Sequence, residues 1–214
     1  MENKKIILFD LDGTLIDSTE AILESFDQAF GYFGVETPVE EKITAEIGHP
    51  LDMMLLSLGV SEESVWDYVA VYKKHYRQIS REKTFLLAGA EEAVRKASEI
   101  ARLGIVTTKT AKYSIELLEH MGLMNHFEVL IGREDVEYPK PHPEPVLKAL
   151  SKFETDTNKC WMIGDTCMDM LSAKSAGIRG IAVTSGYGSK EQLSACCSVI
   201  TESALDAVAS IIRS

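Results

Sequence analysis

The chain has 214 residues, of which 45% are hydrophobic and 26% charged. This composition is typical of a globular protein and excludes a disordered chain. Its formal net charge of −11 opposes binding to nucleic-acid phosphates, so we expect no nucleic-acid partner. No apolar run approaches the roughly 20 residues that cross a bilayer, and the four cysteines lack metal-finger spacing. We therefore expect a reduced, cytoplasmic protein without membrane residence, either a monomer or a homodimer.

Short apolar runs along the chain predict buried strands. The first, Ile6–Phe9, is too short for a helix and suits a strand that is covered on both faces of a parallel sheet. Helical periodicity lies between most of these runs, and glycines fall where helix stops are expected. Alternation of strands and helices predicts an α/β fold with a Rossmann-like parallel sheet. Further strands are expected at 104–107, 129–132, 160–165 and 181–184, helices at 91–102, 112–121, 143–152, 168–176 and 205–213, and helix stops at Gly104, Gly122 and Gly177.

One long interval breaks this alternation. Between the first strand and Gly104 there is no convincing strand, and apolar residues recur at helical spacing instead. We therefore expect an α-helical cap domain at residues 15–85, inserted into a core domain formed by residues 1–14 and 86–214.

Polar side chains follow three of the predicted strands, at Asp10-Leu11-Asp12-Gly13-Thr14, Thr107-Thr108-Lys109 and Gly164-Asp165-Thr166. In open parallel sheets, ligands bind beyond the carboxyl ends of the strands. Carboxylates that meet there repel each other unless a cation lies between them, and Mg²⁺ prefers oxygen ligands together with substrate phosphate. Asp10 and Asp165 are therefore candidate Mg²⁺ ligands, and Asp169, one helical turn further on, is a ligand or a holder of metal-bound water.

The same residues could carry out phosphoryl transfer. Asp10 could attack a phosphoryl group and form an aspartyl-phosphate, with Asp12 placed to act as general acid and base. Lys140 lies in the proline-rich stretch Tyr138–Pro143, where a rigidly held ammonium would neutralise phosphoryl charge. The hydroxyl of Thr107 and the backbone amides after Asp10, around Gly13 and Thr14, could bind phosphoryl oxygens.

These residues resemble the haloacid dehalogenase superfamily, in a phosphatase branch similar to phosphoglycolate phosphatases. The resemblance spans most of the chain and has four motifs in order: Asp10-Leu11-Asp12-Gly13-Thr14, Val106-Thr107, Lys140-Pro141, and Gly164-Asp165-Thr166 with Asp169. It implies Asp10 as nucleophile and Mg²⁺ ligand and Asp165 as Mg²⁺ ligand. It implies Asp12 as general acid and base that ligates Mg²⁺ through its backbone carbonyl, Thr107 and Lys140 as phosphoryl binders, and a mobile helical cap.

Three positions, Thr108, His49 and Ala88, depart from the pattern of many members of that family, and Ala88 replaces a proline common just before Gly89, which could loosen the return from the cap. Thr108 stands where many have asparagine, so its contact with the phosphoryl or leaving group can differ. His49 lies in the cap segment Ile47–Leu51, which resembles a substrate-specificity loop, and is a candidate substrate contact. Cys167, inside the fourth motif, is expected to be a packing residue, and no disulfide is expected between the adjacent Cys196 and Cys197.

The leading hypothesis is a Mg²⁺-dependent phosphatase that hydrolyses a small phosphorylated metabolite through an aspartyl-phosphate. A sugar phosphomutase uses the same core, but the segment around His49 lacks the arginine and lysine residues expected to grip a second phosphate. A non-catalytic phosphate-binding module would be expected to lack Asp10, Asp12 or Lys140, and all three are present. Phosphoglycolate, sugar phosphates, nucleoside monophosphates and pyrophosphate all remain open as substrates.

Overall fold

The structure, a computed structural model, describes residues 4–153 and 156–213; residues 1–3, 154–155 and 214 of the predicted core domain lie outside the described residues. The chain forms two compact units. One unit is Ser18–Phe85, and the other contains the rest of the described chain.

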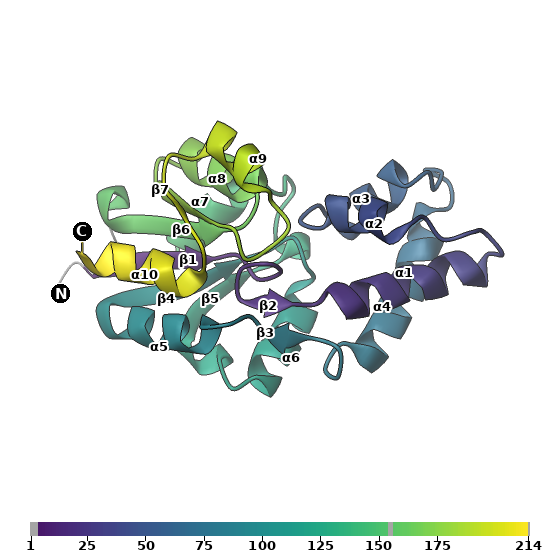
Figure 1. Cartoon of the computed structure of the whole chain (residues 1–214), viewed down its shortest axis with the longest axis horizontal. Helices are drawn as coiled ribbons and strands as arrows, with labels where there is room; N and C mark the ends of the chain where they lie inside the picture. Colours follow the sequence, from purple (N-terminus) through teal and green to yellow (C-terminus); the bar gives the residue numbers. More distant parts are fainter. Residues whose placement is uncertain (1–3, 154–155, 214) are drawn as a thin grey trace. The chain divides into compact units, whose positions relative to one another are not determined.

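The larger unit, the core, is built on a six-stranded parallel sheet with the strand order β5-β4-β1-β6-β7-β8 (Figure 1). The predicted α/β fold is therefore confirmed. The chain starts in the middle of the sheet, builds one side with β4 and β5, and then crosses to build the other. The strands are β1 (Lys5–Phe9), β4 (Ala101–Val106), β5 (Phe127–Ile131), β6 (Cys160–Gly164), β7 (Arg179–Val183) and β8 (Ile200–Thr201).

The register of the central strands brings their carboxyl ends to one edge. Phe9, the last residue of β1, lies opposite Ile105 on β4 and opposite Ile163 on β6. The segments that follow β1, β4 and β6 therefore leave the sheet at the same level. This edge is where the sequence places its polar motifs.

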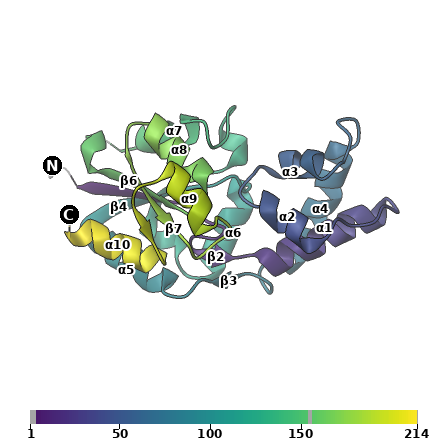
Figure 2. The ribbon, with the colours of Figure 1, turned by 45° about the horizontal axis from the view of Figure 1, so that its top comes forward.

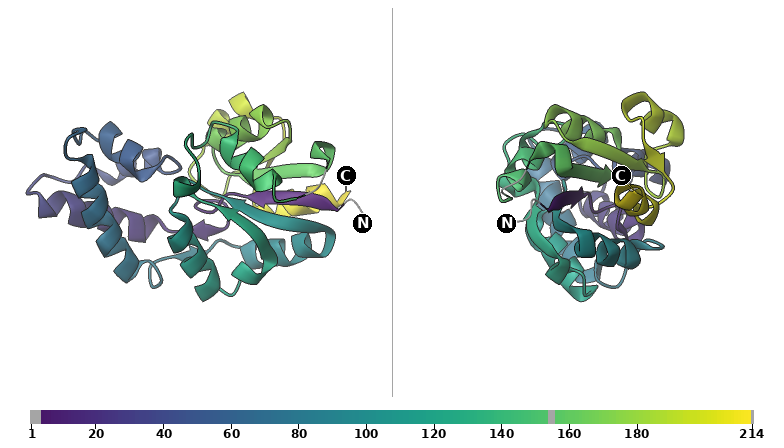
Figure 3. Two further views of the ribbon diagram at one scale, coloured as in Figure 1. Left: turned by 180° about the vertical axis from the view of Figure 1, so that it is seen from behind. Right: turned by 90° about the vertical axis from the view of Figure 1, so that its left-hand side faces the viewer.

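Helices cover both faces of the sheet (Figures 2 and 3). Because successive side chains of a strand point to opposite faces, Ile7 and Phe9 join one apolar cluster while Ile6 and Leu8 join another. The first cluster packs on α5 (Ala90–Ile100), α6 (Ala111–His120) and α10 (Ala204–Arg213). The second packs on α7 (Glu144–Leu150) and α8 (Cys167–Ser175), and α9 (Lys190–Cys196) adjoins α8. Short 3₁₀ helices lie at Met124–His126, Arg133–Asp135 and Thr157–Lys159.

The expected helix stop at Gly104 was wrong. Helix α5 ends at Ile100 and β4 begins at Ala101, so Gly104 lies inside a strand. A Cβ at Gly104 would lie 2.6 Å from Cγ1 of Val129 and 2.8 Å from Cδ2 of Leu8, which shows that glycine is required here for close packing. Gly122 and Gly177, in contrast, follow helices with positive φ angles, as expected. Strand β8 and helix α9 were not anticipated.

The cysteines also differ from expectation. Cys167, predicted to be a packing residue in a reduced protein, forms a disulfide with Cys196 that joins the first turn of α8 to the end of α9. Cys160 and Cys197 are thiols that lie outside this disulfide. Two residues 29 apart in sequence meet because α8 and α9 pack together, a contact that cysteine spacing alone does not reveal.

The smaller unit is helical, with α1 (Thr19–Tyr32), α2 (Glu40–Glu46), α3 (Leu51–Ser57) and α4 (Val65–Ile79). Aromatic side chains join α1 to α4: Phe26 meets Tyr72, and Phe30 meets Tyr68, each with ring centroids 5.2 Å apart. The Lys83 ammonium pairs with Glu24, whose second oxygen contacts His75.

A two-stranded sheet, β2 (Ile16–Asp17) with β3 (Phe85–Leu86), forms where the chain leaves the core and returns to it. Along the described residues of the whole chain, no helix combines the length and apolar character needed to span a membrane.

Candidate active site

Backbone hydrogen bonds hold the segments after the strands at the edge of the sheet. The Asp10 amide, just beyond β1, donates to the carbonyl of Ile163 on β6 at 2.9 Å. The Thr107 amide, just beyond β4, donates to the carbonyl of Ile131 on β5, also at 2.9 Å. Asp165 directly follows β6. Residues far apart in sequence are thus fixed side by side, at the carboxyl ends of neighbouring strands.

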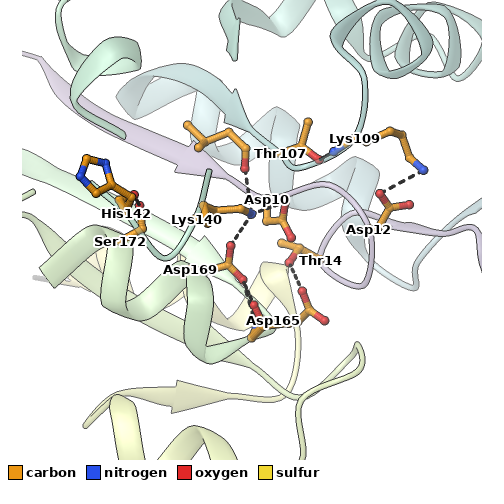
Figure 4. A network of polar contacts seen from close by, with 12 residues as sticks. Asp10, Asp12, Thr14, Thr107, Lys109, Lys140, His142, Asp165, Asp169 and Ser172 are labelled. Atoms are coloured by element: carbon orange, nitrogen blue, oxygen red, sulfur yellow. Dashed lines mark hydrogen bonds and ion pairs between the residues drawn. The ribbon is translucent and has the colours of Figure 1, made fainter. Parts of the chain in front are cut away.

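Three acids meet at this edge: Asp10, Asp165 and Asp169 (Figure 4). Each offers one carboxylate oxygen, and these oxygens all lie within 4.8 Å of one another. Asp10 is only 4% exposed, and Asp165 and Asp169 are 0% exposed. Such a group of buried carboxylates is costly unless cations offset its charge.

Lys140 supplies one of these cations. Its buried ammonium lies 2.8 Å from Oδ1 of Asp10 and 2.5 Å from Oδ1 of Asp169, and it donates to the carbonyl of Val106 at 3.2 Å. Burial alone lowers the pKa of Lys140, but the charges of the two acids outweigh it and raise that pKa above its ordinary value. Lys140 therefore stays an ammonium.

One lysine does not balance three acids. Burial raises the pKa of Asp10 to about 7 in spite of the opposing effect of Lys140, and the charge of Asp169 adds to the rise. Burial also raises the pKa of Asp165 well above its ordinary value, and the charge of Asp10 contributes. A divalent cation among these oxygens would favour their ionised forms.

The donor set fits such an ion. Buried carboxylate oxygens grouped at this separation are the ligands that hard cations such as Mg²⁺ select. Asp10, Asp165 and Asp169 each offer one oxygen to it. Asp169 already has partners for both oxygens: Oδ1 faces Lys140, while Oδ2 accepts hydrogen bonds from the amide and the hydroxyl of Thr166 at 3.0 and 2.7 Å.

Asp165 is positioned by contacts from two other loops. Oδ1 accepts a hydrogen bond from the Thr14 hydroxyl at 3.2 Å, and Oδ2 accepts one from the Tyr187 amide at 2.8 Å. Gly13 has a φ of 78°, and a Cβ there would lie 2.3 Å from Oδ2 of Asp165. The hydroxyl of Ser185 also donates to the Gly13 carbonyl at 3.0 Å. The Gly13–Thr14 turn and residues 185–187 therefore enclose this carboxylate.

Asp12 lies apart from this cluster. Its Oδ2 is 3.2 Å from Nζ of Lys109, and the two side chains are 12% and 11% exposed. Figure 4 shows the Lys109 side chain directed at Asp12, whereas Lys140 is directed at Asp10 and Asp169. The Thr107 hydroxyl oxygen accepts a hydrogen bond from the Lys109 amide at 3.1 Å, so its own proton is available for another acceptor.

The loop that carries Lys140 is held by hydrogen bonds as well as by its prolines. The Glu144 carboxylate accepts from the amides of Glu137 and Tyr138 at 3.0 and 2.9 Å. The Ser172 hydroxyl on α8 donates to the His142 carbonyl at 2.8 Å. These contacts fix the backbone on both sides of Lys140.

The structure brings several of the predicted site residues together and leaves others apart. Asp10, Thr107, Lys140, Asp165 and Asp169 gather at the sheet edge, with Asp12, Gly13 and Thr14 beside them. The Thr14 hydroxyl is directed at Asp165, so its expected substrate contact stays a prediction. Thr108 is half-buried after β4, and His49 lies in the α2–α3 loop of the other unit. Their substrate roles also stay predictions.

Sequence reasoning missed two parts of this arrangement, the Lys109 side chain and the backbone around Tyr187. Lys109 lies two residues after the second motif, and a cation beside two strand-end hydroxyls was a readable signal. The stretch Ser185-Gly186-Tyr187-Gly188 follows β7, where two glycines close together indicate a backbone that approaches another group.

Comparison with known proteins agrees with this geometry. The model of the haloacid dehalogenase-like hydrolase family matches residues 7–183. The chain belongs to the haloacid dehalogenase-like hydrolase family. It is 35% identical to a Halalkalibacterium halodurans protein named pyrophosphatase PpaX, over 85% of this chain and 83% of that one. It is 30% identical to a Salmonella typhi protein named phosphoglycolate phosphatase, over 87% and 84% of the two chains.

A solved structure extends the agreement to the whole fold. A haloacid dehalogenase-like hydrolase from Streptococcus pneumoniae superposes with a TM-score of 0.87 at 27% identity, covering 98% of this chain and 99% of that one. The family expected from the four motifs, its α/β fold and the enzyme class, a haloacid dehalogenase-type phosphatase, are confirmed. The acidic triad could bind a divalent metal.

Proposed function

We propose that this haloacid dehalogenase-like phosphatase hydrolyses small phosphomonoesters through an aspartyl-phosphate on Asp10, with Mg²⁺ as its cofactor. The observation that carries the proposal is the environment of Asp10. Its buried carboxylate lies at the end of β1, 2.8 Å from Lys140 and beside two further acids that could share a cation with it. Bound Mg²⁺ would supply positive charge for the phosphoryl oxygens, held by Asp10, Asp165 and the Asp12 carbonyl, with Asp169 beside it.

In the first step, an oxygen of Asp10 forms a bond to phosphorus while the bond between phosphorus and the leaving oxygen breaks. Asp12 gives a proton to that oxygen, and the leaving group departs as an alcohol. Lys140 and the Thr107 hydroxyl hold the phosphoryl oxygens in both steps. The Gly13 and Thr14 amides already donate to the carbonyls of Ile16 and Leu11, at 2.8 and 3.3 Å, so the phosphoryl contact predicted for them would require these bonds to break.

In the second step, a water oxygen attacks the phosphorus of the aspartyl-phosphate while Asp12 takes a proton from the water. The bond from phosphorus to Asp10 breaks, which releases inorganic phosphate and restores the Asp10 carboxylate. Asp12 therefore ends the cycle with the proton that it gave away in the first step.

The helical unit at residues 18–85 is proposed to act as the cap that excludes water and selects the leaving group. His49 is its candidate contact with substrate, and Thr108 is a candidate on the core. The names of two relatives support phosphoglycolate or pyrophosphate as the first substrates to test. A small phosphorylated metabolite is the proposed partner, and the enzyme is proposed to act as a monomer or a homodimer.

A cytoplasmic location is proposed from the sequence, but the Cys167–Cys196 disulfide does not support it, because such bonds are rare in reducing compartments. Cell fractionation of the tagged full chain would decide this point. Recovery of the protein in an extracytoplasmic fraction would reject the proposed location.

Replacing Asp10 with Asn tests the mechanism. We expect purified Asp10→Asn to release less than about a thousandth of the phosphate that the wild type releases from an aryl phosphate in Mg²⁺. Asp206→Asn, an exposed acid in the first turn of α10, is the matched control and should keep wild-type turnover. Near-full activity of Asp10→Asn would reject the aspartyl-phosphate. Rapid sugar-phosphate isomerisation with little phosphate release would instead indicate a phosphomutase.

A further inference from the structure

The site contains two lysines, and they face different acids. The Lys140 ammonium contacts the carboxylates of Asp10 and Asp169, where the phosphoryl group is proposed to bind. The Lys109 ammonium lies 3.2 Å from Oδ2 of Asp12, which is proposed to carry the proton (Figure 4). Lys109 is therefore at the leaving-group end of the site, and the proposed mechanism gives it no task there.

The backbone around Lys109 is fixed from both sides. Its amide donates to the Thr107 hydroxyl oxygen at 3.1 Å, and its carbonyl accepts from the Arg133 amide at 3.0 Å. Two residues later, the Ala111 amide donates to the Glu134 carboxylate at 3.0 and 3.1 Å. The loop after β4 is thus tied to the loop after β5, which fixes the backbone from which the flexible Lys109 side chain extends toward Asp12.

Distance limits what the ammonium can reach. Asp12 must be within about 3 Å of the leaving oxygen to transfer a proton, and Nζ of Lys109 is 3.2 Å from that same carboxylate. The ammonium is therefore within roughly 6 Å of a leaving oxygen that faces Oδ2 of Asp12. A carboxylate or a phosphate carried close to that oxygen could accept a hydrogen bond from Lys109, whereas an uncharged group would gain far less.

The burial of Lys109 and the net charge of the chain strengthen the preference for a negatively charged leaving group. The Lys109 side chain is only 11% exposed, so water and salt screen its charge less than they would at the open surface. The chain as a whole carries a net charge of −11, which repels an anionic substrate unless a local cation offsets it. Lys109, beside Asp12, is such a cation, and it is distinct from Lys140, which contacts Asp10.

We propose that Lys109 is a specificity-determining residue that selects phosphate esters and anhydrides whose leaving group carries its own negative charge next to the leaving oxygen. The charge is that of a carboxylate or of a second phosphate. The inference rests on the proposed function, because it uses Asp12 as the residue that faces the leaving oxygen.

Steady-state kinetics in Mg²⁺ with three substrates test the inference. 2-Phosphoglycolate carries a carboxylate, pyrophosphate a second phosphate, and 2-hydroxyethyl phosphate an uncharged hydroxyl in the same place. For Lys109→Ala and Lys109→Gln we expect kcat/KM to fall roughly 30- to 100-fold on the preferred anionic substrate, mainly through KM, and less than about 5-fold on 2-hydroxyethyl phosphate. Lys109→Arg should restore most of the loss. The anionic substrate with the larger loss identifies the group that Lys109 binds.

Lys112→Ala is the matched control, because it removes a lysine from the exposed surface of α6 and should keep the wild-type ratio between substrates. Thermal melts of all variants establish that each is folded. Equal losses on all three substrates would overturn the inference, since Lys109 would then act only by holding Asp12. An unchanged ratio of kcat/KM between the anionic substrates and 2-hydroxyethyl phosphate in the Lys109 variants would overturn it as well. Failure of the proposed function looks different: the wild type would then release no phosphate from any of the three substrates.

Discussion

Gly186 lies where any side chain would collide with a proposed metal ligand. A Cβ at this position would be 2.1 Å from Oδ2 of Asp165 and 2.6 Å from the carbonyl oxygen of Gly13. Neither neighbour can yield easily, because Asp165 is held by Thr14 and by the Tyr187 amide, and the other atom belongs to the backbone. Gly186→Ala must therefore displace either the loop after β7 or the Asp165 carboxylate.

The size of the effect follows from these contacts. Forcing one extra methyl group into a closely packed site costs about 1–3 kcal/mol. A chain of this length loses roughly 2–4 °C in Tm for each kcal/mol, so we expect a decrease of about 2–12 °C. Disturbing a residue that orients a metal ligand typically weakens metal binding about 10- to 100-fold. We expect the Mg²⁺ concentration for half-maximal activity of Gly186→Ala to rise by that factor.

Thermal melts and Mg²⁺ titrations of phosphate release measure both quantities. Gly31→Ala is the matched control, because Gly31 lies inside α1 and a Cβ there would have nothing within 4 Å. Alanine in a helix interior is favoured over glycine by roughly 0.5–1 kcal/mol, so the Tm of the control should hold or rise. If Gly186→Ala kept the wild-type Tm and Mg²⁺ requirement, the close enclosure of Asp165 would be refuted.

Three further predictions concern the metal, the disulfide and the helical unit. Mg²⁺ at about 100 times its Kd should stabilise the wild type by about 2.7 kcal/mol, and Asp165→Asn should lose this rise in Tm. Reducing the Cys167–Cys196 bond, which spans 29 residues, should cost about 3–4 kcal/mol by the chain-entropy estimate, seen as a lower Tm in dithiothreitol. A hydrogen bond from Lys83, with a smaller contribution from His75, holds the pKa of Glu24 below its ordinary value of 4.5. The Glu24 carboxylate therefore stabilises the fold above pH 4.5, and this stabilisation is lost as the pH falls through the lowered pKa. Glu24→Gln should therefore lower Tm by more at pH 7 than at pH 3.

Each of these has a clear contrary result. Equal Mg²⁺-induced shifts in wild type and Asp165→Asn would remove Asp165 from the metal site. A Tm that dithiothreitol lowers as much in Cys196→Ser as in the wild type could not come from this disulfide. A Glu24→Gln deficit that persisted unchanged at pH 3 would mean that packing, rather than charge, is responsible.

The sequence by itself determined the architecture of the core and the candidate residues for its chemistry. Short apolar runs such as Ile6–Phe9 predict buried strands because each is too short for a helix and too apolar for a surface segment. Parallel strands place their carboxyl ends together, so the sequence alone predicts that Asp10, Thr107 and Asp165 meet. These features are local in the chain or follow from the rules of parallel sheets.

Only the tertiary structure decided how those residues are held. Gly104 is inside β4 because Leu8 and Val129 leave no room for a side chain, and neither neighbour is near it in sequence. The Tyr187 amide reaches Asp165, and Cys196 reaches Cys167, because β7 lies beside β6 and α9 packs on α8.

The contact between Lys109 and Asp12 has the same origin, since it joins two loops that start from the neighbouring strands β4 and β1. Such contacts depend on the separation of side chains in space, which periodicity and motif spacing along the chain do not encode. The residues that could do the chemistry can be found in the sequence, whereas the partners that orient and tune them are fixed only when the sheet brings its loops together.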